Sequence, residues 1–388
     1  MSSIELFAGA GGLAMGMANA GFQHSAVVEW DKDACQTIRE NRHHYDSHGE
    51  DFVLFDGDAR DFDLTPFVDD VEIISGGPPC QPFSLGGKHK GNLDERDMFP
   101  VAVRAVNRAM PKAFIFENVK GLLRQSFASY FEYIYLQLSY PDKPKRAKES
   151  WEDHLGRLEA LHSSGKQRPT YNVCFRLLNA ADYGIPQKRE RVFIVGFRSD
   201  LKVEWSFPEP THSEYGLLHS KWITGEYWKR HKIPKSKRPQ APPNIEARLQ
   251  RLEAAKKHAP GRQPWVTVRD AISDLPNPEK SSPGLFEIPN HVFNPGARSY
   301  KGHTGSPYDE PSKTLKAGAH GVPGGENMLV KDDGSVRYFT VREAARIQTF
   351  PDNYVFHGAW SETMRQLGNA VPVKLAQVVA QSVAAVLR

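Results

Sequence analysis

Ser3-Ile4-Glu5-Leu6-Phe7-Ala8-Gly9-Ala10-Gly11-Gly12 is a short apolar run that ends in a glycine-rich turn. A helical pattern follows from Leu13 to Ala20 and stops at the next glycine. Glu29 stands 20 residues after Gly9, near the end of a second apolar run, Ser25–Trp30. A strand, a glycine turn, a helix and a second strand with an acidic residue near its end are typical of a nucleotide-binding βαβ unit.

Short apolar runs and helical patterns continue to alternate through about residue 125. Val71–Ser75 and Ala113–Glu117 predict two further buried strands, with a helix between them around Phe99–Met110. Asp31 is predicted to cap a helix that runs to about Asn41. The alternation predicts an α/β protein built on a doubly wound, mostly parallel sheet.

The second half of the chain is organised differently. A strand pair is predicted at Tyr171–Leu178 and Arg191–Phe197, after a polar insertion at about residues 141–169. Beyond this pair periodicity fades while Pro and Gly accumulate, until a strong amphipathic helix is predicted at Val371–Leu387. We therefore predict a catalytic, cofactor-binding domain and a smaller, loop-rich domain. Their predicted bounds are 1–200 completed by 357–388, and 201–356.

Composition narrows the class of protein. Only three cysteines, Cys35, Cys80 and Cys174, occur in 388 residues, which argues against a disulfide scaffold and for a reducing, cytosolic compartment. No apolar stretch approaches the roughly 18 uninterrupted residues of a membrane span. The first residues lack the basic and long apolar regions of a signal peptide.

The net charge of +4 is concentrated in one part of the chain. Residues 219–262 hold 12 basic and 3 acidic side chains, together with Trp222, Tyr227 and Trp228. Such a stretch is either a solvated basic surface or a polyanion-binding face with aromatic rings available to stack.

Three further motifs place reactive side chains at predicted strand ends. The run Gly76-Gly77-Pro78-Pro79-Cys80-Gln81-Pro82-Phe83-Ser84 is a stiff loop, and a cysteine held there is a candidate nucleophile rather than an inert buried thiol. Glu117 ends another buried strand, where a carboxylate is poor core material. Arg189 and Arg191 share one face of an extended chain, which suits phosphate or a developing anion, although a solvated basic edge has the same pattern.

Taken in linear order, these motifs resemble those of the C5-cytosine DNA methyltransferases of bacterial restriction-modification systems. The resemblance covers nearly the whole chain except residues 141–169 and much of 201–335. The motifs that carry it are Phe7-Ala8-Gly9-Ala10-Gly11-Gly12, Glu29-Trp30, Gly57-Asp58-Ala59, Pro78-Pro79-Cys80-Gln81, Glu117-Asn118-Val119, Gln187-Lys188-Arg189-Glu190-Arg191, Arg342-Glu343-Ala344-Ala345-Arg346-Ile347-Gln348-Thr349-Phe350-Pro351 and Gln366-Leu367-Gly368-Asn369-Ala370-Val371-Pro372.

The resemblance implies an S-adenosyl-L-methionine-dependent methyltransferase fold, with the cofactor at the ends of the first strands. It assigns ribose binding to Glu29 and adenine binding to the segment around Asp58, and it implies no metal site. The residues implied to bind the cofactor are Phe7, Ala8, Gly9, Gly11, Gly12, Leu13, Glu29, Trp30, Asp58, Ala59, Pro79, Asn369 and Val371.

The implied reaction is transfer of a methyl group to C5 of a cytosine that is flipped out of duplex DNA. By resemblance, Cys80 adds to C6 of the base and Glu117 assists at N3. Arg189 and Arg191 are implied to stabilise the base carbonyl and to orient the site. Loss of the C5 proton and departure of Cys80 complete the implied reaction.

The resemblance also makes double-stranded DNA the partner and residues 201–335 the variable target-recognition region. Gln81 and Ser84 are implied to fill the gap left by the flipped base and to grip phosphate. The implied DNA-binding elements of the recognition region are Thr314, Leu315 and a loop at 318–325. We expect a monomer with no obligate protein partner and no membrane association, acting in the bacterial cytoplasm on nucleoid DNA.

Three other functions remain open at this point. The glycine turn and Glu29 also suit a nicotinamide- or flavin-dependent oxidoreductase, which would leave Cys80, Glu117 and the paired arginines without linked roles. An RNA methyltransferase would use the same chemistry, and the long basic region favours DNA. A catalytically silent DNA-binding module would not need the complete motif set.

Overall fold

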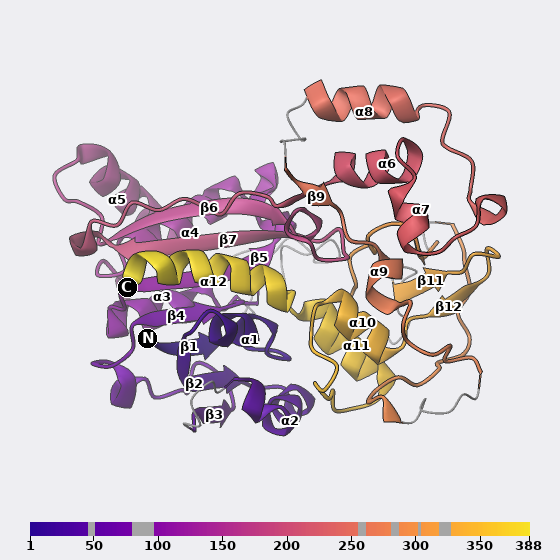
Figure 1. Ribbon diagram of the computed structural model, residues 1–388. Helices are drawn as coiled ribbons and strands as arrows, with labels where there is room; N and C mark the ends of the chain where they lie inside the picture. Colours follow the sequence, from indigo (N-terminus) through magenta and orange to yellow (C-terminus); the bar gives the residue numbers. More distant parts are fainter. Residues whose placement is uncertain (46–50, 80–96, 255–260, 281–286, 302–303, 318–326) are drawn as a thin grey trace.

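Seven strands form the central sheet, in the order β3-β2-β1-β4-β5-β7-β6 (Figure 1). The computed structural model describes residues 1–45, 51–79, 97–254, 261–280, 287–301, 304–317 and 327–388. The strands are β1 (Ser2–Leu6), β2 (Gln23–Glu29), β3 (Val53–Asp56), β4 (Ile73–Gly76), β5 (Ala113–Val119), β6 (Tyr171–Asn179) and β7 (Glu190–Arg198). All but β3 were predicted from the sequence; β3 has only four residues, none of them buried, so it lacks a clear apolar run.

The pairing confirms a doubly wound, mostly parallel sheet. β3, β2, β1, β4 and β5 pair in parallel, whereas β7 runs antiparallel to both β5 and β6. The chain moves outward from β1 to β3 and then returns to β4 on the other side of β1. This reversal leaves a crevice at the carboxyl ends of β1 and β4, where open α/β sheets place their ligands.

Alternate residues of β5 supply the two cores that hold the helices on the sheet. Phe114 and Phe116 pack on the face covered by α3 (Phe99–Ala109) and α4 (Ala128–Ser139). Ala113 and Ile115 pack on the opposite face, with α1 (Gly12–Asn19) and α12 (Val373–Leu387). The apolar alternation of a two-sided buried strand thus produces the three-layer arrangement seen in Figure 1. The predicted insertion forms α5 (Trp151–Ser164), which packs against α4.

The C-terminal helices form an apolar stretch that is interrupted at Pro372. Within the described ranges, Trp360–Leu387 is the only helical stretch long and apolar enough to cross a membrane, and 56% of its most apolar window is buried inside the protein. α11 (Trp360–Asn369) and α12 lie on either side of the break. Gly16 of α1 approaches α12 so closely that a Cβ there would lie 2.3 Å from the Cβ of Ala376. The apolar residues of α12 therefore serve helix–helix packing.

The remainder of the chain forms the second region, on the right of Figure 1. Its first part is helical and its second part carries a small sheet. The elements are β8 (His212–Ser213), α6 (Glu214–Trp222), α7 (Glu226–Arg230), α8 (Ile245–Ala254), β9 (Gln263–Pro264), α9 (Val268–Ile272), β10 (Ser306–Pro307), β11 (Met328–Val330), β12 (Val336–Tyr338) and α10 (Val341–Ile347). One core joins Ala10 and Tyr45 of the sheet region to Ile347 and Leu367. This core continues across residue 356, where we predicted the boundary between the two domains. That boundary stays a prediction.

Candidate functional site

A cavity of about 660 Å³ opens at the carboxyl ends of β1, β2, β4 and β5. It lies at the reversal of the strand order, and its volume is typical of a site for a small molecule. Most of the residues that the sequence assigned to the cofactor line it. They are Phe7, Ala8, Gly9, Leu13, Glu29, Trp30, Asp58, Ala59, Pro79, Asn369 and Val371.

The turn after β1 has an unusual backbone. Phe7 and Gly9 both have positive φ values, 58° and 56°, and a phenylalanine adopts this conformation only where its surroundings enforce it. The turn directs the amide of Gly9 toward the end of β2, where it donates a hydrogen bond of 2.7 Å to Oε2 of Glu29. The turn and the acid predicted from the sequence therefore form one unit.

The other two predicted glycines, Gly11 and Gly12, do not line the cavity. A Cβ on Gly11 would lie 1.9 Å from the Tyr45 hydroxyl oxygen, and a Cβ on Gly12 would lie 2.2 Å from the backbone oxygen of Val371. These glycines allow Tyr45 and the segment before α12 to close over the first turn of α1. The two glycines therefore serve close packing around the start of α1.

Glu29 is held in place by three backbone amides. Its Oε2 accepts from Gly9, and its Oε1 accepts from Trp30 at 3.0 Å and from Asp31 at 2.8 Å. Burial raises the pKa of Glu29, and the three amides oppose that rise. The indole of Trp30 remains 73% exposed although it lines the cavity. An anchored acid beside an open aromatic ring can bind ribose hydroxyls and cover a purine.

Asp58 lies at the far wall of the cavity, and both of its carboxylate oxygens accept hydrogen bonds from Arg60. This contact lowers the pKa of Asp58, which keeps the carboxylate ionised. The backbone amide of Arg60 also donates to Oδ1, so Arg60 holds the Asp58 carboxylate firmly at the cavity wall.

The predicted partner acid and one of the two predicted arginines form a buried ion pair. Oε1 of Glu117 lies 2.8 Å from Nε of Arg191, and both side chains line the cavity. Burial raises the pKa of Glu117, whereas Arg191 and, more weakly, Arg189 lower it. Asn118 donates a 2.9 Å hydrogen bond to the carbonyl oxygen of Pro78. That bond fixes the start of the predicted nucleophile loop beside the ion pair.

Arg189 does not reach the cavity, so the two arginines do not form the shared face that was predicted. Its side chain is fully buried and donates to the backbone oxygens of Leu315, Gly368 and Ala370. All three acceptors are backbone carbonyls, which places Arg189 at a packed contact between segments.

The structure describes only some of the residues that were predicted to contact DNA. Cys80, Gln81, Ser84 and the loop at 318–325 lie outside the described residues. Thr314 donates its hydroxyl to the backbone oxygen of Lys188 at 2.7 Å. Leu315 is only 1% exposed, so its side chain packs in the core and does not face DNA.

Four charged residues of the cavity wall were missed by the sequence reasoning. They are Glu5, Asp31, Arg60 and Arg365. Burial raises the pKa of Glu5 to about 8, and Ser75 donates a hydrogen bond to its carboxyl group. Asp31 and Arg365 form a 2.7 Å ion pair at the mouth. Glu5 could have been found, because a carboxylate between Ile4 and Leu6 in an apolar strand carries the same signal as Glu117.

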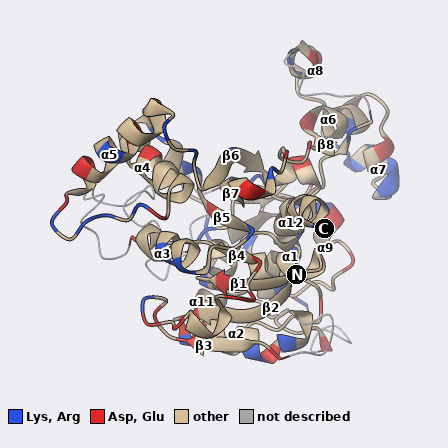
Figure 2. Cartoon of the chain, turned by 90° about the vertical axis from the view of Figure 1, so that its left-hand side faces the viewer, with Lys and Arg blue, Asp and Glu red and all other residues tan. Residues whose placement is uncertain are grey.

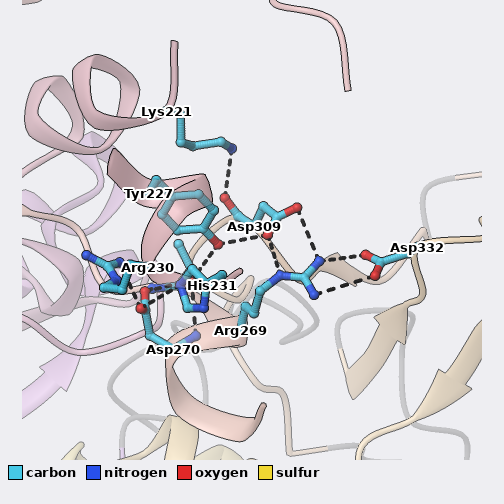
Figure 3. Close-up of polar contacts among 9 residues, drawn as sticks. Lys221, Tyr227, Arg230, His231, Arg269, Asp270, Asp309 and Asp332 are labelled. Carbon is cyan, nitrogen blue, oxygen red and sulfur yellow. Dashed lines mark hydrogen bonds and ion pairs between the residues drawn. The ribbon is translucent and has the colours of Figure 1, made fainter. Parts of the chain in front are cut away.

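A polar network joins the helices of the second region to its small sheet (Figure 3). Asp309 accepts hydrogen bonds from the Tyr227 hydroxyl at 2.8 Å and from Nε of Arg269 at 2.6 Å. The same guanidinium contacts Asp332 at 2.6 Å. α7, α9 and the turn between β11 and β12 are therefore held as one unit.

The outer surface of that unit is basic. Lysines 229, 232, 235 and 237 are exposed, and none of them forms an ion pair with a carboxylate in the described part of the chain. Figure 2 shows the blue end of α7 projecting from the body of the protein. Arg230, by contrast, binds Asp270 at 2.8 Å and so belongs to the internal network. No group of three His, Cys, Asp or Glu side chains that could hold a metal ion occurs among the described residues.

Comparison with known proteins gives a consistent result. Residues 1–140 and 148–385 match the family described as C-5 cytosine-specific DNA methylase. The Type II methyltransferase M.NgoMIV of Neisseria gonorrhoeae is 30% identical over 100% of this chain and 98% of its own length. M.Eco47II of Escherichia coli, also named a Type II methyltransferase, is 32% identical over 98% of this chain and 78% of its own length.

Solved structures share the fold at low sequence identity. The Entamoeba histolytica methyltransferase EhMeth aligns with a TM-score of 0.57 at 14% identity, covering 100% of this chain and 99% of that chain. The S. pombe Dnmt2 methyltransferase aligns with a TM-score of 0.54 at 16% identity, covering 100% and 98%. These likenesses support the fold assignment.

Proposed function

Because this chain belongs to the C-5 cytosine-specific DNA methylase family, it is a DNA (cytosine-5-)-methyltransferase, and we propose that Cys80, Glu117 and Arg191 carry the transfer. The observation that supports this assignment most directly is the buried contact between Glu117 and Arg191 inside the cavity. Asn118 tethers the chain two residues before Cys80 to the same place.

We propose that the cavity binds S-adenosyl-L-methionine. The fit rests on Glu29, whose carboxylate is fixed for ribose hydroxyls, on the exposed ring of Trp30 and on the place of Asp58 in the cavity wall. When bound, this cofactor supplies an electrophilic methyl group on a sulfonium.

The residues then have separate tasks. The Cys80 thiolate forms a bond to C6 of the flipped cytosine, and electron density moves toward C5 and N3. Glu117, whose pKa is raised by burial, holds a proton for N3 at that moment. Arg191 orients Glu117 and stands beside the base carbonyl. Transfer of the methyl group to C5 would leave the cofactor as a neutral thioether. A base then takes the C5 proton, N3 returns its proton to Glu117 and the C6–S bond breaks, which restores the aromatic ring and the free thiolate.

The second region is proposed to recognise the target sequence. The basic surplus of residues 219–262 and the exposed lysines of the α7 surface support contact with phosphates. Thr314 and Leu315 contribute to this region through backbone placement. We further propose that the protein acts as a monomer without an obligate protein partner, in the bacterial cytoplasm on nucleoid DNA, as part of a restriction-modification system like its Type II relatives.

The family assignment also separates this function from a dinucleotide-dependent oxidoreductase, because the C-5 cytosine-specific DNA methylase model matches residues 1–140 and 148–385.

Transfer of tritium from labelled S-adenosyl-L-methionine to unmethylated duplex DNA, with tRNA as the competing substrate, tests the function. Label in DNA alone is expected, and bisulfite sequencing of that DNA identifies the target. Cys80→Ser should abolish transfer while DNA binding persists. Cys174→Ser, at a half-buried thiol outside the motifs, is the matched control and should retain transfer. Turnover by Cys80→Ser would remove Cys80 from the role of nucleophile.

A further inference from the structure

Arg189 joins two parts of the protein that belong to different sites. Its Nη1 donates to the carbonyl oxygen of Leu315 at 3.0 Å, and its Nη2 donates to Gly368 at 2.7 Å and to Ala370 at 2.8 Å. Leu315 belongs to the second region, whereas Gly368 and Ala370 belong to the motif Gln366–Pro372 at the end of α11. One side chain thus bonds to both.

The carbonyls at the α11 end belong to the cavity wall. Gly368, Asn369, Ala370 and Val371 all line the cavity proposed to hold the cofactor. A shift of the Gly368 or Ala370 carbonyl would therefore displace Asn369 within that wall. Arg189 does not line the cavity itself, so its hydrogen bonds hold this part of the wall from the side that faces away from the cavity.

The segment on the other side is pressed against the same helix end. A Cβ on Gly368 would lie 2.1 Å from the backbone nitrogen of Ala317 and 2.4 Å from the carbonyl carbon of Lys316. Backbone meets backbone at this contact, so neither segment can move far without moving the other. The chain continues directly from Ala317 into the loop at 318–325 that the resemblance assigns to DNA.

Residues next to Arg189 attach the same segment to the sheet. Gln187 Oε1 accepts from the amide of Leu315 at 3.0 Å, and Thr314 donates to the carbonyl oxygen of Lys188 at 2.7 Å. Gln187 also donates to Gln348, whose own amide donates to Ala370. The segment at Thr314–Leu315, the sheet and the cavity wall at Gly368–Ala370 thus share one set of buried hydrogen bonds. We call this set the 187–189 junction.

The junction has little tolerance for displacement. No carboxylate among the described residues forms an ion pair with Arg189, and the hydrogen-bond acceptors of this fully buried guanidinium are the three backbone carbonyls. A buried donor that loses its acceptor carries a large desolvation cost. Movement of Leu315 away from Gly368 would leave at least one such donor unpaired.

We propose that Arg189 is a positioning residue that couples the recognition region to the cofactor cavity, so that DNA binding raises the affinity for S-adenosyl-L-methionine and the reverse. Contact of DNA with the segment after Leu315 holds that segment against α11, which keeps the wall at Gly368–Ala370 in its binding arrangement. Thermodynamic linkage requires the same factor in both directions. The proposal rests on the assignment of cofactor and DNA given above.

The test measures coupling rather than activity alone. Initial rates of tritium transfer to unmethylated plasmid DNA are recorded while both substrates are varied, which gives the factor by which DNA lowers the KM for S-adenosyl-L-methionine. We expect a factor of at least about 5 for the wild type and less than about 2 for Arg189→Lys. Calorimetry measures the dissociation constant for S-adenosylhomocysteine in the absence of DNA. This constant should differ much less between the wild type and Arg189→Lys than the coupling factor does.

Arg342→Lys is the matched control. Arg342 is also fully buried and also donates to three backbone carbonyls, those of Pro289, Pro351 and Tyr354, but it does not line the cavity. Both variants should melt at a lower temperature, and only Arg189→Lys should lose the coupling. If Arg189→Lys does not fold, Thr314→Val removes one bond of the junction and should reduce the factor partially.

The proposal is overturned by a wild-type factor near 1, by full coupling in Arg189→Lys or, if that variant does not fold, in Thr314→Val, or by equal loss in Arg342→Lys. Failure of the proposed function looks different, because the wild type would then transfer no label to DNA at any substrate concentration.

Discussion

Glu117 and Arg191 meet across two antiparallel strands, with 2.8 Å between Oε1 of the acid and Nε of the arginine. In the register of β5 and β7, Arg191 is paired with Val119, so its side chain reaches back along β5 to the carboxylate. Burial and the nearby guanidinium act on the pKa of Glu117 in opposite directions, and burial is the larger effect. The contact therefore sets both the position and the proton affinity of the acid.

Arg191→Lys should lower kcat by about 100-fold or more, because lysine offers a single ammonium in place of a rigid planar fork. Tritium transfer at saturating DNA and cofactor measures the change. Arg198→Lys, on the same strand but paired with Asp200 at the other end, should retain kcat within about twofold. Equal losses in the two variants would show that β7 tolerates no such substitution, and would count against a specific role.

The pH dependence of kcat/KM should reveal Glu117. Its pKa in the folded protein is raised, so the protonated form persists to higher pH than in an exposed glutamate and is lost as pH rises through that value. If the proton is used at N3, kcat/KM declines on the alkaline side. Glu117→Gln should lower the rate by about 10²–10⁴ and remove that decline. An unchanged alkaline limb in the variant would assign it to another group.

Glu29→Gln should weaken binding of S-adenosylhomocysteine by about tenfold or more, because three backbone amides orient the carboxylate and one of them would face an amide nitrogen in the variant. Isothermal titration calorimetry gives the dissociation constant. Glu40→Gln, at the exposed end of α2 (Lys32–Glu40), makes the same chemical change away from the cavity and should bind like the wild type. Undiminished affinity in Glu29→Gln would exclude the ribose contact.

Glu5 should make stability depend on pH. Its pKa is raised to about 8 in the folded protein from about 4.5, so its favourable contribution is complete below pH 4.5 and is lost as pH rises toward 8. The neutral isostere Glu5→Gln avoids that loss. In urea titrations, the free energy of unfolding of the variant should therefore rise relative to that of the wild type between pH 5 and pH 8, by a few kcal/mol at most. A difference that stays constant across this range would mean that Glu5 is ionised throughout.

Two glycine substitutions should have opposite effects on the free energy of unfolding. Gly12→Ala places a Cβ against the backbone oxygen of Val371 and should cost about 1–3 kcal/mol, with weaker cofactor binding. Gly156→Ala, on the exposed side of α5 where no atom lies within 4 Å, should stabilise the helix by about 0.5–1 kcal/mol. Denaturant titration of both proteins tests the pair, and an unaffected Gly12→Ala would show that the segment before α12 can shift.

The strands of the sheet and the reactive side chains could be predicted from the sequence, because short stretches of sequence identify them. A strand such as β5 must be apolar on both faces, and an acid at its end, such as Glu117, stands out against that background. The glycine turn and Glu29 carry a fixed spacing, since a βαβ unit brings them together at every occurrence. The mostly parallel sheet and most of the cavity wall were therefore predictable.

Only the tertiary structure decided what Arg189, Gly11, Gly12 and Leu315 do. Each lies within or beside a motif, yet each contacts residues 34 to 359 positions away along the chain, and periodicity carries no information about such partners. The sequence placed Arg189 and Arg191 together because alternate residues of an extended chain share a face. In the folded protein the two side chains have different partners. The Arg191 guanidinium contacts the buried carboxylate of Glu117, whereas the Arg189 guanidinium donates to backbone carbonyls.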